Sequence, residues 1–570
     1  MERTLAAGVL LAVLGGYWIL AWRIEAGQEP FWSAPRVLVY SGVLTILGAC
    51  AVAFSGRRHR ETAVGTTTAN GRSRAVATIA ALGVGLVVAA GPISGAWSRL
   101  YGVDLALWSA PPLLFLAGIA LAAFGALAGF TWETTQHDPT RRSTLWRATR
   151  IDALPWAQGE TGLYLAAGLL LAVVTGVVAE YDFDVAPHDA LYHPILLCGT
   201  SALVLTAAVR AAGRIGGATL AATAYTAVRL LAQAEVGALT GIRPQIPLLL
   251  VAAPAIDLAL WRLSLAISRR ASVPGHGERA WIVAPLTGVA FTATLLLVQW
   301  PYTVAANAVV WGPDVLAVAA LPALLAGAAG ASLGWYFGAR LRPIGQRPAS
   351  APEPPRPART FVGPAVVVAL ALAGLCAVAI VPALVNRGAP LAWSASTARG
   401  TVVGTLELTP AVPIAGQPLS VRLTVTDPFL IAGPTLLPFE TQRLGDVAAG
   451  NLSAASQPGV YQGTFTPREP GRRRLSVFLQ IQEVRTAASA TFVVYRPEDA
   501  PPTAPQPARS VVLRPQPAPE LDIPLWLQPL TLAILAGLLG GAAVGTHLAL
   551  RRARQSAALT RAVPSPSRLS

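Results

Sequence analysis

The stretch LAAGVLLAVLGGYWILAW, residues 5–22, contains no charged side chain. A helix needs roughly 20 apolar residues to cross the ~30 Å hydrocarbon core of a bilayer. The run is long for the apolar region of a signal peptide, it ends in Trp18 and Trp22, and it lacks a small-residue cleavage site. It therefore predicts a membrane-spanning helix that stays attached to the chain.

Similar apolar runs follow along the 570 residues, and hydrophobic residues make up 54% of the chain. Only 12% of residues are charged and the mean hydropathy is +0.53, values that exclude a soluble globular protein. We expect a polytopic α-helical membrane protein with about 12 transmembrane helices in the lipid bilayer. The expected spans are 5–22, 36–55, 75–96, 105–130, 162–180, 190–209, 216–236, 246–267, 281–300, 309–338, 361–385 and 525–549.

Arginine supplies every basic residue, and its clusters follow alternate spans. Because cytoplasmic loops of membrane proteins carry an excess of basic residues, we expect both termini in the cytoplasm. The net charge of +15 then reflects topology, and nucleic acid is not an expected partner. The clusters are Arg57, Arg58 and Arg60; Arg141, Arg142, Arg147 and Arg150; Arg210 and Arg214; Arg269, Arg270 and Arg279; residues 340–359; and Arg551, Arg552 and Arg554. Tryptophans expected among headgroups at the outer ends of spans are Trp18, Trp22, Trp32, Trp97, Trp108, Trp300 and Trp311.

Two Pro-rich segments divide the chain, and between them the sequence alternates apolar and polar residues. Such period-two runs, separated by Pro, Gly and Asp turns, predict an antiparallel Ig-like β-sandwich outside the cytoplasm. The runs are 401–409, 419–426, 460–466, 474–481 and 488–495. The expected order is a ten-helix transmembrane domain at 1–342, a Pro-rich cytoplasmic linker at 343–360, helix eleven at 361–386, the β-sandwich at 396–496, a Pro-rich tether at 497–524, helix twelve at 525–549 and a basic cytoplasmic tail at 550–570.

Two stretches of the sandwich, GVYQGTFTPREPG (459–471) followed by RLSVFL (474–479), and AGQPLSVRLTVTD (415–427), resemble YtkA-like and FixH-like Ig-type modules. The resemblance implies a module associated with copper-resistance membrane proteins of the CopC and CopD type, in the inner membrane of a bacterium. Its metal chemistry does not carry over, because residues 390–524 contain no His, Met or Cys, the ligands that copper prefers.

The connection EYDFDVAPHDALYHP (180–194) holds two of the six histidines. If Pro187 lies in the first turn of the next helix, Asp189 and His193 lie on one face. With Asp184 and His188 they form a candidate metal site for copper or another divalent ion. The alternative is structural, because acidic residues in a first turn stabilise the helix dipole and His residues are common at membrane interfaces.

Arg229 and Asp257 lie inside expected spans, where a charge needs a partner. We expect these two residues to pair across neighbouring helices. Glu235, further out, would extend this polar track toward the histidines. A structural ion pair and a transport site are equally compatible with the pattern.

The chain contains no P-loop, no G-x-S-x-G and no C-x-x-C motif, and we expect no enzyme. Three functions fit the sequence. The first is a protein that handles a metal ion or assists a respiratory or copper system. The second is a secondary transporter with its site at Arg229 and Asp257. The third is an assembly subunit that binds a periplasmic or membrane protein partner.

Overall fold

The computed structural model describes most of the helical region, much of the β domain and one C-terminal helix. The described residues are 1–26, 32–55, 67–101, 107, 110–137, 160–183, 191–240, 243–268, 280–305, 311, 313–341, 403–425, 436–443, 446–468, 470–481, 484–498, 500, 502, 508–512, 514–515 and 537–551. The predicted cytoplasmic linker, the predicted helix eleven and nearly all of the basic tail lie outside these residues.

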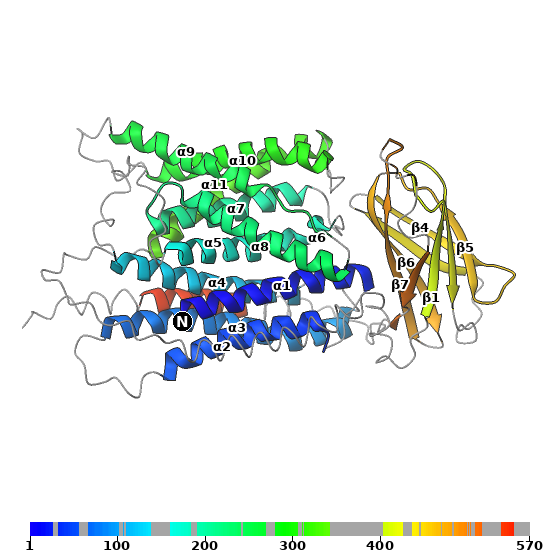
Figure 1. Ribbon diagram of the computed structural model, residues 1–570, viewed down its shortest axis with the longest axis horizontal. Helices are drawn as coiled ribbons and strands as arrows, with labels where there is room; N and C mark the ends of the chain where they lie inside the picture. The colour runs from blue at the N-terminus through cyan, green and yellow to red at the C-terminus, as the bar shows by residue number, and fades with distance from the viewer. Residues whose placement is uncertain are drawn as a thin grey trace, which may run out of the picture.

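A helix is present at each of the first ten predicted spans (Figure 1). The helices are α1 (Glu2–Ala26), α2 (Ala34–Ser55), α3 (Thr67–Tyr101), α4 (Ala110–His137), α5 (Glu160–Thr175), which continues through η2 (Gly176–Val178) into α6 (Ala179–Asp182), α7 (Tyr192–Ala212), α8 (Gly217–Thr240), α9 (Leu249–Ser268), α10 (Ala280–Ala305) and α11 (Pro313–Leu341). Within the described part of the chain, eight helices are long and apolar enough to cross a membrane: α1, α2, α3, α4, α5 with its continuation to Asp182, α7, α10 and α11.

Glycine lets pairs of helices approach closely, as is common in membrane bundles. A Cβ at Gly330 would collide with the carbonyl of Gly199, and a Cβ at Gly334 would collide with the carbonyl of Leu203. These contacts advance together along α11 and α7, so the two helices run parallel. Gly83 of α3 and Gly118 of α4 also allow a close approach, because a Cβ at either residue would collide with the carbonyl of the other.

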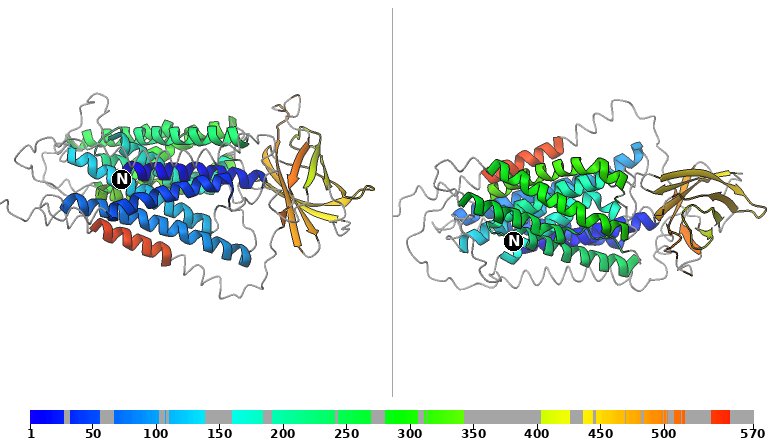
Figure 2. Two further views of the ribbon diagram at one scale, coloured as in Figure 1. Left: turned by 60° about the horizontal axis from the view of Figure 1, so that its bottom comes forward. Right: turned by 90° about the horizontal axis from the view of Figure 1, so that it is seen from above.

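The residues 537–551 form a helix in the place of the predicted helix twelve. Its Ala542 packs with Leu86 and Ala90 of α3 and with Leu114 of α4. Figure 2 shows this C-terminal helix along the side of the bundle.

The strands form one antiparallel sheet in the order β8-β1-β2-β5-β4-β3-β6-β7-β9. Their bounds are β1 (Val403–Thr409), β2 (Leu419–Val425), β3 (Leu436–Arg443), β4 (Asp446–Ala454), β5 (Val460–Phe465), β6 (Gly471–Ile481), β7 (Val484–Val494), β8 (Ala508–Val512) and β9 (Arg514–Pro515). Each predicted strand run overlaps a strand, whereas β3, β4, β8 and β9 were not predicted.

The sheet curls around one apolar core. Leu406 of β1 and Leu423 of β2 pack in the same cluster as Phe439 of β3, Val477 of β6 and Phe492 of β7. Strands β1 and β2 from one half of the sheet therefore face strands β3, β6 and β7 from the other half. The segment 508–515 continues from β8, which pairs with β1, into β9, which pairs with β7.

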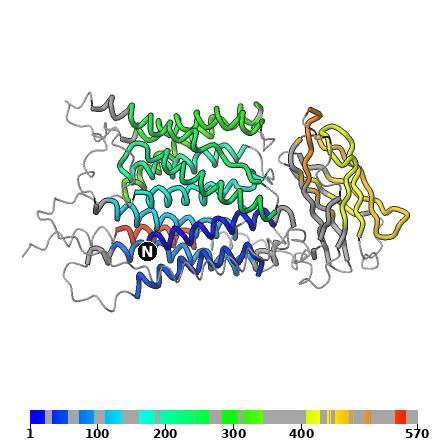
Figure 3. The backbone as a smooth tube through the Cα atoms, in the orientation of Figure 1, coloured from blue at the N-terminus to red at the C-terminus, as the bar shows by residue number. Residues whose placement is uncertain are grey.

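The sheet lies beyond one end of the helical bundle (Figure 1). Helix α1 runs from the N-terminus toward the sheet and contacts β7. The backbone trace in Figure 3 shows the same arrangement, with the N-terminus away from the sheet. The end of the bundle that carries α6 faces the sheet.

Candidate functional site

A stretch without regular secondary structure, residues 243–248, connects α8 to α9 at the end of the bundle that faces the sheet. Pro244 and Pro247 interrupt it, and a residue that precedes proline is restricted to extended conformations. The chain therefore leaves α8 and returns into the bundle before α9 begins at Leu249. We call residues 243–248 the return segment.

Side chains from two helices bind the polar backbone groups of the return segment. Gln233 Nε2 donates to the Pro244 carbonyl at 2.7 Å, and Arg229 Nη2 donates to the Gln245 carbonyl at 2.7 Å, both from α8. From α10, Gln299 Oε1 accepts a hydrogen bond from the Leu248 amide at 2.8 Å. These bonds replace those that a helix would supply, which an apolar environment demands.

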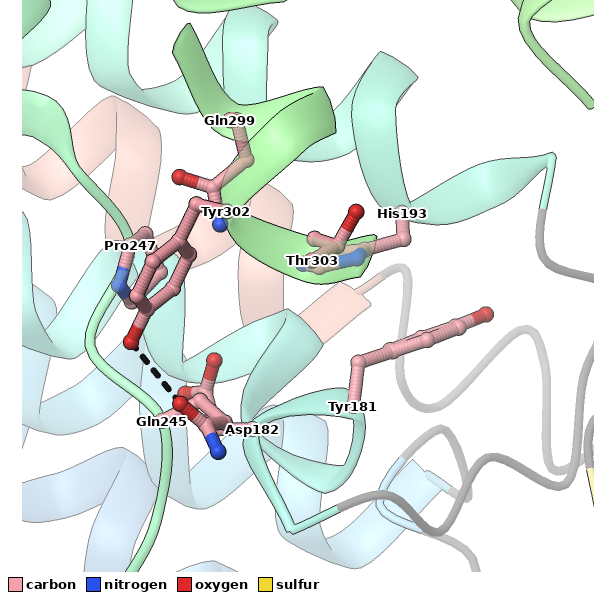
Figure 4. A pocket seen from close by; sticks show the side chains of 8 residues that line it. All are labelled: Tyr181, Asp182, His193, Gln245, Pro247, Gln299, Tyr302 and Thr303. Atoms are coloured by element: carbon pink, nitrogen blue, oxygen red, sulfur yellow. Dashed lines mark hydrogen bonds between the residues drawn. The ribbon is translucent and has the colours of Figure 1, made fainter. Parts of the chain in front are cut away.

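Gln245 is bound from two more directions. Its backbone N–H donates to the backbone carbonyl of Asp182 at 2.7 Å. Its side-chain Oε1 accepts a hydrogen bond from the Tyr302 hydroxyl at 2.8 Å (Figure 4). Together with the bond from Arg229, these contacts join α6, α8 and α10 through one residue.

Arg229 forms an ion pair with Asp182, and the distance from Nη2 to Oδ2 is 2.8 Å. The two side chains are only 1% and 3% exposed. The guanidinium also lies over the ring of Tyr17 of α1, 4.2 Å from its centroid. Removing one member of such a buried pair costs about 3–5 kcal/mol, because the other charge stays buried without a partner.

The structure does not bring Arg229 and Asp257 together as predicted. Asp257 instead binds the start of α8: its Oδ1 accepts from the amides of Gly216 at 2.8 Å and Ala218 at 3.4 Å. Its Oδ2 accepts from the amide of Thr219 at 2.9 Å and from the Thr219 hydroxyl at 2.6 Å. A carboxylate stabilises a helix start by satisfying free amides and by its charge.

The return segment explains this difference. Arg229 lies ten positions after Thr219 in α8, which is about 15 Å along the helix at 1.5 Å per residue. Since the return segment brings the chain back past Arg229 before α9 begins, Asp257 lies at the far end of α8. The acidic partner of Arg229 comes instead from α6, where the turn η2 leads from α5 into the residues that end at Asp182.

His193 is buried in the first turn of α7, with 4% of its surface exposed. Its ring stacks on Tyr181, with centroids 4.7 Å apart and planes 11° apart. Its Nδ1 accepts a hydrogen bond of 3.1 Å from the indole nitrogen of Trp311. Because an indole nitrogen only donates, Nδ1 carries no proton and Nε2 carries the proton of the neutral ring. Trp311 is fully buried, so its predicted place among headgroups is wrong.

This tautomer leaves His193 no nitrogen for a metal ion. Nδ1 is engaged by Trp311, and Nε2 carries the proton. The other three residues of the predicted metal site, Asp184, His188 and Asp189, lie outside the described residues. Within the described part of the chain, no three His, Cys, Asp or Glu side chains are grouped in a way that would hold a metal.

A narrow cavity lies between α6, α7, the return segment and α10, with room for about one water molecule. Figure 4 shows its lining side chains, which come from these four parts of the chain. They are Tyr181, Asp182, His193, Gln245, Pro247, Gln299, Tyr302 and Thr303. Asp182, the acidic member of the ion pair with Arg229, therefore borders this cavity.

Glu235 lies further along α8 and is not among the residues that line the cavity. Its Oε2 is buried without a hydrogen-bond partner among the described residues. Glu180, two residues before Asp182 in α6, accepts a hydrogen bond of 2.7 Å from the backbone amide of Leu107. Asp182 and Glu180 thus bind different residues, and among the described residues no hydrogen bond links Glu235 to either.

Sequence reasoning missed Asp182, Gln245, Gln299 and Tyr302 as members of the site. The signals were Pro244 and Pro247, which flank Gln245, and a glutamine inside the apolar run of α10. No family model, curated protein or solved structure matches the chain.

Proposed function

We propose that the chain is a multi-pass protein of a bacterial inner membrane, with twelve spans, both termini in the cytoplasm and the sheet outside as an Ig-like sandwich. Three of the described arginines support this orientation. Arg210 and Arg340 lie in the last turns of α7 and α11, and Arg214 lies in the turn between α7 and α8, away from Asp182 and the sheet. Basic residues favour the cytoplasmic side.

We further propose that the helical bundle acts as a secondary transporter whose site is the Arg229–Asp182 pair with the return segment. The observation that carries this proposal is the non-helical return segment, whose backbone is bound by side chains of α8 and α10. Membrane proteins tolerate such backbone where it is buried in protein or lines a cavity, and transporters build substrate sites from it. Buried charges inside a bundle favour the same function.

The metal-handling function has less support. His193 is the one histidine of the predicted metal site that lies among the described residues. Its Nδ1 accepts a hydrogen bond from Trp311, and its neutral ring lines the cavity. The copper association rests on the resemblance of residues 415–479 alone.

Uptake into liposomes tests the transport proposal. The purified protein is reconstituted and challenged with labelled amino acids, small carboxylates, sugars, Cu²⁺, Zn²⁺ and a pH jump. We expect at least one of these to enter faster than into empty liposomes. Arg229→Lys keeps the charge but loses the planar guanidinium, which lies over the Tyr17 ring and whose Nη2 donates to both Asp182 and Gln245, so uptake should fall at least tenfold while the protein stays folded.

Arg214→Lys is the matched control, because Arg214 pairs with Glu160 at 3.4 Å at the other end of the bundle. It should transport like the wild type. Equal uptake by Arg229→Lys and wild type, or no uptake of any member of the panel, would contradict the proposal. A stable partner that co-purifies from native membranes in the absence of uptake would instead favour the assembly subunit.

A further inference from the structure

Two hydrogen-bond donors with fixed orientations belong to the lining of the cavity. The first is Nε2–H of His193, since Trp311 occupies Nδ1. This nitrogen is buried without a partner among the described residues. The second is the amide nitrogen of Gln299, since its Oε1 accepts from the backbone amide of Leu248 and must therefore be the oxygen.

An acceptor completes the lining. Asp182 lines the same cavity, and its side chain is 3% exposed. Its charge is balanced by Arg229 at 2.8 Å. A molecule between these groups would receive hydrogen bonds from His193 and Gln299 and could donate one to the carboxylate.

Two N–H donors and one carboxylate acceptor favour some classes of ligand over others. A metal cation would face two N–H donors, and an anion would face the carboxylate of Asp182. A neutral molecule that both accepts and donates hydrogen bonds satisfies all three groups. The cavity is large enough for about one water, and buried waters commonly bond two to four polar groups that lack other partners.

We propose that the cavity is a binding site for one neutral amphiprotic molecule, water in the conformation described, which bridges His193 and Gln299 to Asp182. The inference rests on the same site as the proposed transport function, and it names the class of ligand that this site accepts. It makes the Arg229–Asp182 pair a hydrated ion pair at the end of the bundle that faces the sheet.

Radiolytic labelling in H₂¹⁸O tests the site in the full chain. Hydroxyl radicals that form from a bound water oxidise the aromatic side chains next to it. Tyr181 lines the cavity and Tyr225 does not, although the two are 2% and 0% exposed. We expect ¹⁸O incorporation at Tyr181 to exceed that at Tyr225 at least fivefold.

Substitution of the donor gives a second measurement. In His193→Phe, which preserves a ring to stack on Tyr181, labelling of Tyr181 should fall at least threefold toward the value for Tyr225. Equal, slow labelling of the two tyrosines in the wild type would overturn the proposal, and this comparison requires no variant to fold. Labelling of Tyr181 in a protein without uptake would leave the water site standing and remove only the transport function.

Discussion

Replacing Arg229 by Met would leave the Asp182 carboxylate buried without its cation. The two side chains are 1% and 3% exposed, so bulk solvent does not screen the charge. An uncompensated buried charge of this kind costs about 3–5 kcal/mol. The carbonyl of Gln245 also loses its donor, which adds about 1–3 kcal/mol. We therefore expect Arg229→Met to lower the free energy of unfolding by more than about 4 kcal/mol.

The double variant Arg229→Met/Asp182→Leu removes both charges. No uncompensated charge then remains at the pair, the Gln245 carbonyl lacks its donor, and the cost should fall to about 1–3 kcal/mol. The single changes cost about 3 kcal/mol or more each, so the coupling free energy between the two positions should be about 3 kcal/mol or larger.

Unfolding in mixed micelles, followed by tryptophan fluorescence and circular dichroism, measures these free energies. Arg214→Met is the control, because the side chains of Arg214 and Glu160 are 26% and 12% exposed. Their pair, at 3.4 Å, should contribute about 0–1 kcal/mol. Additive effects of the two single substitutions would refute the burial argument, as would a cost of Arg229→Met no larger than that of Arg214→Met.

Three further substitutions separate other contributions to the fold. Gly334→Ala places a Cβ on the Leu203 carbonyl and should cost about 1–3 kcal/mol in the same unfolding assay, whereas Gly48→Ala, which meets open space, should not destabilise. Asp257→Ala removes the bonds to the start of α8 and should cost about 0.5–2 kcal/mol, visible as faster amide exchange at residues 216–219. Leu423→Ala, in the sheet core, should cost about 2–5 kcal/mol and make the sheet sensitive to limited proteolysis while the helices resist it. Unchanged proteolysis of the sheet would contradict its independent core.

Hydropathy predicted where the first ten helices lie because each apolar run is long and is bounded by polar residues. Period-two alternation predicted β1, β2, β5, β6 and β7 for an equally local reason. The strands β3 and β4 escaped prediction, since Pro438 interrupts the first and Gly450 with Asn451 interrupts the second.

The partner of Arg229 could not be predicted in this way. The position of Arg229 inside a predicted span indicated that this residue needs an acidic partner. The choice between Asp182 and Asp257, however, depends on where α9 begins. The prolines at 244 and 247 delay that start, whereas the apolar run alone placed it at 246. How each helix is rotated against its neighbours is equally hidden in one sequence, and so the approach of His193 to Trp311 was missed.

The continuation of β8 into β9 limits how the outer domain can meet other molecules. The free edge of a sheet invites another chain to add a strand, both in peptide recognition and in aggregation. Here one segment pairs with residues 403–407 of β1 through residues 508–512 and with residues 486–487 of β7 through residues 514–515, so the outer edge of β1 is covered along most of its length and that of β7 only near its start. Truncation of the chain before residue 508 would remove this cover and free the outer edge of β1 for pairing with another chain.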